Sequence, residues 1–202
     1  MRVRARWNQK DNQRGLRDIA GVIAVNAWKI AGEVVLNLEN EGFETTTQRQ
    51  RLDVIGEVCA FLLHCVDRLI YGKFEEEDRA EFVTAVAVRL TALMNDNRID
   101  AEGPGDYRQA FVELLNARMD DYSDCVYSEK DGPGFNLRRT LGEHVRERMG
   151  ARDNKWITDY VMDLEGPKAL DHLERALKGM FPVQFGVDEA TLRGRRKRNM
   201  DD

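Results

Sequence analysis

The chain has 202 residues, of which 42% are hydrophobic and 33% are charged, and its formal net charge is −5. This length favours a single domain, and the charged fraction is typical of helices with one buried and one charged face. The low proline count of four disfavours an all-β protein. Three cysteines without a C-x-x-C spacing exclude a disulfide framework, so we expect a cytoplasmic protein.

The charge is distributed unevenly along the chain. Residues 1–17 carry six Lys/Arg against one acid, and residues 193–202 carry five against two. The sequence between them carries 20 Lys/Arg against 33 acids. The sequence therefore predicts an acidic helical domain over 16–181, with a basic and flexible segment at each end, over 1–15 and 182–202.

Apolar residues recur at spacings of three and four along most of the chain, which is the period of an amphipathic helix. We expect seven helices and no strand. The predicted ranges are 16–39, 45–71, 75–94, 107–126, 136–149, 154–165 and 167–181. The pair Gly166-Pro167 predicts a break between the last two. The sequence thus predicts an all-α, bundle-like single domain.

The first predicted helix is apolar around most of its circumference, which indicates a central position. Asn26, Lys29, Glu33 and Asn37 form a narrow polar stripe on it. If the stripe faces inward, it lines a ligand pocket with Tyr107 and Tyr122, between the first, second and fourth helices. If it faces outward, it is ordinary helix solvation.

The second predicted helix carries a seven-residue repeat, which is typical of a seam between antiparallel helices. The seam residues are Leu52, Ile55, Cys59, Leu62, Val66 and Leu69. Glu57 and His64 lie opposite this seam, so we expect both in water. A carboxylate–imidazole binding site on that face is the alternative.

No motif in the sequence identifies a reaction. The chain has no Glu-x-x-His for a dinuclear metal site, and no nucleotide-binding, hydrolase or metalloprotease motif. We therefore expect no metal and no cofactor. The apolar run Val58–Leu63 is far shorter than the ~20 residues that span a bilayer, so we expect no transmembrane segment.

The basic ends are the candidate partner-binding segments. Their cations are Arg2, Arg4 and Arg6 at one end, and Arg193, Arg195, Arg196, Lys197 and Arg198 at the other. The acidic domain disfavours nucleic acid as the partner. Our interpretation is a non-catalytic interaction or regulatory protein that self-associates or docks on a protein partner. A ligand-binding bundle or small enzyme is the alternative, and an accessory protein of nucleic acid or membranes is a third.

Overall fold

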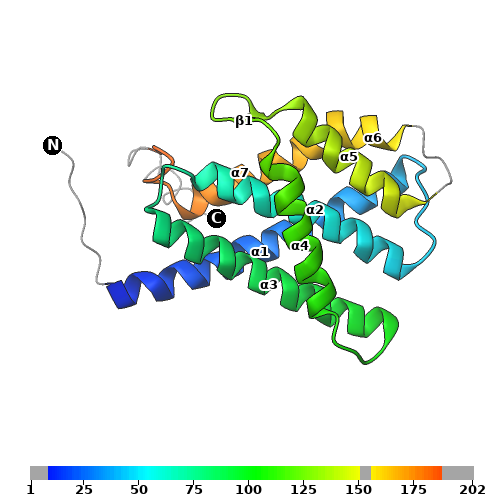
Figure 1. The fold of residues 1–202 in the computed structure, drawn as a ribbon, viewed down its shortest axis with the longest axis horizontal. Helices are drawn as coiled ribbons and strands as arrows, with labels where there is room; N and C mark the ends of the chain where they lie inside the picture. The colour runs from blue at the N-terminus through cyan, green and yellow to red at the C-terminus, as the bar shows by residue number, and fades with distance from the viewer. Residues whose placement is uncertain (1–8, 151–155, 188–202) are drawn as a thin grey trace, which may run out of the picture.

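The computed structural model describes residues 9–150 and 156–187, with side chains from residue 15 onward (Figure 1). Its helices are α1 (Gln9–Asn40), α2 (Gln48–Ile70), α3 (Glu76–Glu102), α4 (Arg108–Ser123), α5 (Phe135–Met149), α6 (Ile157–Tyr160), the π-helical turn η1 (Val161–Glu165) and α7 (Gly166–Met180). A two-residue ladder of β1 (Tyr127–Ser128) and β2 (Gly132–Pro133) closes the loop between α4 and α5. The prediction of an all-α single domain is confirmed.

The centre of the bundle is α2, which packs against α1, α3, α4, α5 and α7. Every residue from Gly56 to Asp67 is buried, because neighbouring helices cover it on all sides. Helix α1 lies at the edge and crosses α3 (Figure 1). One side of α1 packs on α2, α3 and α7, and Val22, Lys29 and Leu36 are exposed on its opposite side.

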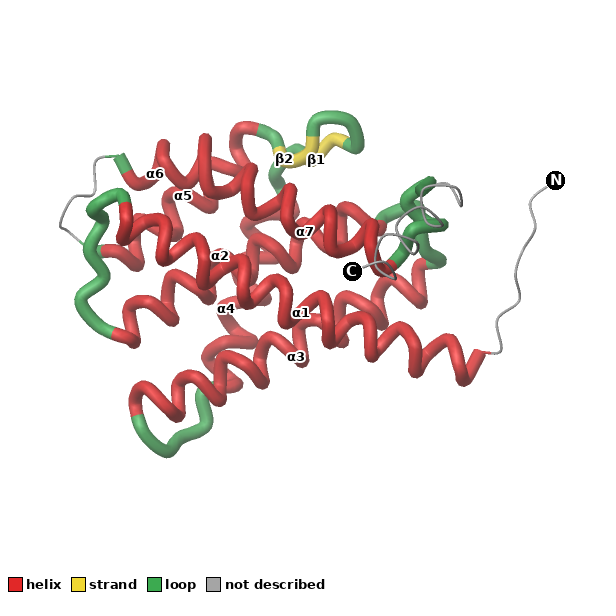
Figure 2. The backbone as a smooth tube through the Cα atoms, turned by 180° about the vertical axis from the view of Figure 1, so that it is seen from behind, coloured by secondary structure: helices red, strands yellow, loops and turns green. Residues whose placement is uncertain are grey.

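The predicted break at Gly166-Pro167 is wrong, since α6, η1 and α7 follow one another as a single helix (Figure 2). The described residues therefore contain six helices rather than seven. Pro167 has no N–H, and the π-turn accommodates it: the Gly166 N–H donates to the carbonyl of Val161, five residues back. In that register Pro167 leaves the Met162 carbonyl without a helical donor, and Arg138 Nη1 donates to it at 3.3 Å.

Two other predicted boundaries are wrong as well. Helix α1 begins at Gln9, so residues 9–15 of the predicted basic segment are helical. Helix α3 continues to Glu102 through residues that we expected in a loop. Arg98 stabilises this last stretch, because it pairs with Glu102 on its own helix at 2.5 Å and with Asp53 on α2. Gly103, with a φ of 96°, then ends the helix.

Candidate functional site

The predicted polar stripe lies on the outer side of α1. Lys29 and Glu33 are exposed, and Glu33 Oε2 lies 3.7 Å from His172 Nδ1 of α7. Asn26 is half-buried, and its side-chain amide donates to the Val22 carbonyl at 3.1 Å on the same helix. Asn37, the last member of the stripe, is half-buried and its amide donates to the buried Glu165 carboxylate at 2.8 Å. Lys29 and Glu33 therefore do not line the interior of the bundle, whereas Asn37 contacts it.

The two candidate tyrosines lie apart from this stripe and from each other. Tyr107 precedes α4, where its hydroxyl donates to the Gly103 carbonyl at 3.1 Å and it lines a pocket of about 360 Å³ beside Leu52 and Met94. Tyr122 is fully buried farther along α4. Of the candidate ligand-binding residues on different helices, the structure brings only His64 and Tyr122 together, with ring centroids 5.6 Å apart. The full set of candidates was Asn26, Lys29, Glu33, His64, Tyr107 and Tyr122.

The expectation that Glu57 and His64 face water is wrong, because α4 and α5 cover that side of α2. Glu57 has no exposed surface. Arg118 of α4 binds its carboxylate through two nitrogens, at 2.6 and 3.0 Å, and Arg148 of α5 donates to it at 2.8 Å. The hydrogen bonds to Glu57 raise the pKa of the Arg118 guanidinium above its ordinary value, which is already high. A buried carboxylate is stable only with such partners.

His64 belongs to a buried ring cluster in which Tyr122 stands between His64 and His144. Burial, reinforced by the Arg68 cation, lowers the pKa of His64 to about 4. Burial also raises the pKa of the Tyr122 hydroxyl well above its usual value. Both side chains are therefore neutral near pH 7. Within the described residues, no group of three His, Cys, Asp or Glu side chains is placed to hold a metal ion.

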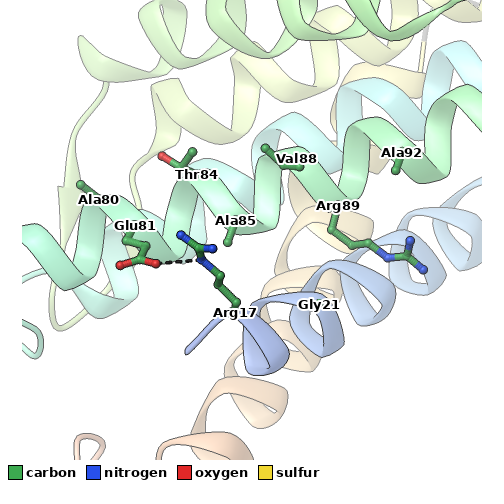
Figure 3. A pocket seen from close by; sticks show the side chains of 9 residues that line it. All are labelled: Arg17, Gly21, Ala80, Glu81, Thr84, Ala85, Val88, Arg89 and Ala92. Carbon is green, nitrogen blue, oxygen red and sulfur yellow. Dashed lines mark hydrogen bonds and ion pairs between the residues drawn. The ribbon is translucent and has the colours of Figure 1, made fainter. Parts of the chain in front are cut away.

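An open groove lies where α1 and α3 meet (Figure 3). Its volume is about 720 Å³, and it is lined mainly by small and apolar side chains of α3: Ala80, Thr84, Ala85, Val88 and Ala92. Gly21 of α1 forms the other wall. Arg17 of α1 reaches across to Glu81 at 2.9 Å, and Arg89 lies farther along α3 (Figure 3). Val88 is 65% exposed.

The side of α1 beside this groove carries a second row of residues, which we call the outer stripe. This row differs from the predicted polar stripe, although Lys29 belongs to both. Its members recur at spacings of three and four: Gly15, Asp18, Val22, Val25, Lys29, Gly32 and Leu36. Val22 is 41% exposed and Leu36 is 59% exposed. Added Cβ atoms at Gly15 and Gly32 would meet no atom within 4 Å. The groove adjoins the outer stripe at Arg17 and Gly21, and we call the stripe and the groove together the docking face.

Helix α1 is long and apolar enough to cross a membrane by length and composition over Gly15–Asn40, the one such helix in the described part of the chain. A core helix passes the same test, although only 44% of the apolar window in α1 is buried. The prediction from unbroken apolar runs missed it, because Lys29 and Glu33 interrupt the run. Helix α1 therefore has more apolar surface than the bundle covers.

Sequence reasoning missed both the docking face and the Glu57 cluster. The heptad spacing of the outer stripe was readable, but an all-round apolar helix indicated burial on every side. The basic residues of the two ends, from Arg2 to Arg6 and from Arg193 to Arg198, lie outside the described residues. No protein-family model, curated protein or solved structure matches the chain.

Proposed function

We propose that this chain is a non-catalytic helical interaction protein and that its docking face binds an α-helix of a partner protein. One observation carries this proposal: Val88 is exposed on the wall of an open apolar groove, and Val22 is exposed next to Gly21, which lines the same groove. Contiguous apolar surface of this kind, rimmed by charges, is typical of interaction sites.

The shape of the groove favours a helix as its occupant. Alanines and glycine line it, so the backbone of a second helix can approach closely, and Val88 is exposed on its wall. An amphipathic helix presents a matching apolar row at spacings of three and four. Such a helix would bury apolar surface on both partners, which is the main favourable term in association.

The rim of the groove indicates the charge of that helix. Arg17 is paired with Glu81, whereas Arg89 is exposed and makes no ion pair with another described residue. An acidic residue beside the apolar row of the partner helix would pair with Arg89. Electrostatic complementarity of this kind contributes to specificity and to the rate of association more than to affinity.

A bilayer is a poorer occupant of the same face. The inner side of α1, with Ala20, Ile23 and Ala24 at 0% exposure, is packed against the bundle along its length. Insertion of α1 across a membrane would strip these core contacts from α2, α3 and α7. Adsorption of the intact bundle to a lipid surface, without insertion of α1, is tested separately with lipid vesicles.

The proposal is tested with a synthetic amphipathic helix that has leucine and alanine on one face and glutamate beside them. We expect saturable binding to the full chain by fluorescence anisotropy, and at least a ~10-fold weaker affinity for Val88→Arg, because the substitution places a cation in the groove. Val112→Arg is the matched control, since Val112 is a 38% exposed valine on α4. Absence of saturable binding to the unmodified chain would contradict the proposal.

A further inference from the structure

We infer that the helix bound by the docking face is α1 of a second copy of this chain, running antiparallel to the first. This inference rests on the proposed function and names its partner. The observation behind it is that the outer stripe is self-complementary from Gly15 to Gly32. About the midpoint between Ile23 and Ala24, Val22 is the counterpart of Val25, and Asp18 is the counterpart of Lys29.

Two-fold symmetry turns this pattern into contacts between two copies. In an antiparallel pair related by a two-fold axis, each residue meets the residue that lies equally far on the other side of the axis. Val22 of one copy then meets Val25 of the other, and this contact occurs twice around the axis. Spacings of three and four are those of a helix pair packed through one continuous row.

The charges of the outer stripe select the antiparallel orientation. Asp18 and Lys29 are both exposed, and neither makes an ion pair with another described residue. An antiparallel pair places each Asp18 opposite the Lys29 of the other copy. A parallel pair would instead place Asp18 beside Asp18 and Lys29 beside Lys29, and like charges in contact disfavour that arrangement.

The ends of the stripe allow the two helices to approach. Gly15 and Gly32 are counterparts about the same midpoint, and space is open beyond both Cα atoms. From one glycine to the other, the contact row is about 26 Å long at ~1.5 Å per residue. The second α1 would also lie beside the groove of each copy, next to Arg17 and Gly21.

A charge-swap experiment on the full chain tests the inference by sedimentation equilibrium. We expect the unmodified chain to dimerise, and Asp18→Lys or Lys29→Asp alone to weaken dimerisation at least ~10-fold, because each creates two like-charge contacts. The chain with both substitutions should regain the original affinity. An equimolar mixture of the two single variants should form a heterodimer, since all its facing charges are opposite.

A pair of valine variants separates the interface from general effects of mutation. Val22→Glu should abolish dimerisation, whereas Val112→Glu on α4 should leave it unchanged, because the two valines are similarly exposed on helices. Circular dichroism on every variant checks that the helices persist. A variant that fails to fold is replaced by the charge swaps, which alter only exposed side chains.

Each result supports or overturns the inference. A monomer at every concentration overturns it, and the synthetic helix then still decides the proposed function separately. A dimer that ignores the charge swaps overturns the antiparallel pairing alone. Binding of the unmodified chain to anionic phosphatidylserine vesicles, without self-association and without binding of the synthetic helix, assigns the face to a lipid surface and overturns both.

Discussion

At the scale of single residues, Glu57 shows how a charge is tolerated in the centre of this bundle. Its carboxylate accepts hydrogen bonds from Arg118 and Arg148, which come from two different helices. The burial of an ion is costly, but removal of one partner from a buried pair is costlier, because an uncompensated charge remains. The three side chains thereby tie α2 to α4 and α5.

Glu57→Gln should lower the free energy of unfolding by about 3 kcal/mol, because both arginines lose their anionic partner. Urea denaturation followed by circular dichroism measures this loss. Glu33→Gln is the control, since Glu33 is 61% exposed and its replacement should change stability by less than about 0.5 kcal/mol. Equal stability of the two variants would contradict a structural role for Glu57.

His64 should make stability depend on pH. Its pKa is lowered to about 4 in the folded chain from an ordinary 6.5, so between these values only the unfolded chain binds the proton. Stability should therefore fall as the pH falls from 6.5 towards 4, by on the order of 3 kcal/mol from this group. His64→Phe should remove that part of the pH dependence, as measured by urea denaturation across the range. Parallel profiles for the two proteins would refute this prediction.

At the scale of helices, a glycine sets the distance between α5 and α6. A Cβ atom added at Gly142 would lie 2.6 Å from the Thr158 carbonyl oxygen, which belongs to the backbone of α6 and cannot turn aside. The close contact leaves no room for a side chain. It also fixes the start of the long helix that continues through η1 into α7.

Gly142→Ala should lower the free energy of unfolding by about 1–3 kcal/mol, because the methyl group forces the two helices apart. Gly179→Ala on α7 is the control, since an added Cβ there meets no atom within 4 Å. That substitution should raise stability by about 0.5–1 kcal/mol through helix propensity. Thermal unfolding of both variants measures the two opposite shifts, and a shift of the same sign in both would contradict the close contact.

At the scale of the whole molecule, the charge layout predicts an electrostatic part to association. The acidic body, at −13 over residues 18–192, attracts basic segments of another copy or of a partner. We expect the basic residues from Arg193 to Arg198 to contribute to this attraction. Because α1 begins at Gln9, the matching deletion at the other end is limited to residues 1–8.

Deletion of residues 1–8 and 190–202 should raise the dissociation constant of the dimer at low ionic strength, because the basic segments no longer meet an acidic surface. Salt screens exposed charges over about 10 Å at 0.1 M, so the difference should shrink as salt is added. Sedimentation equilibrium of the full and shortened chains at two salt concentrations measures it. Identical constants at low salt would show that the ends take no part in assembly.

Most helices were predictable from the sequence, because they depend on local apolar spacing and on terminating glycines. The all-α class and the approximate position of each helix follow from such short-range signals. Boundaries were missed where distant partners decide them: Asp53 of α2 holds Arg98 in the last turns of α3. The predicted break at Gly166-Pro167 was wrong because Arg138 of α5 donates a hydrogen bond to the Met162 carbonyl, which Pro167 leaves without a helical donor.

The sequence by itself determined the helical periods, the uneven charge and the lack of a recognisable catalytic motif. Only the tertiary structure decided which faces are covered. It buried Glu57 and His64, because α4 and α5 cover that side of α2, and Arg118 and Arg148 of these helices pair with Glu57. It left Val22 of α1 and Val88 of α3 exposed, because no helix of the described residues covers them. An apolar residue has the same local signal in a core and on a docking face, and long-range packing alone distinguishes them.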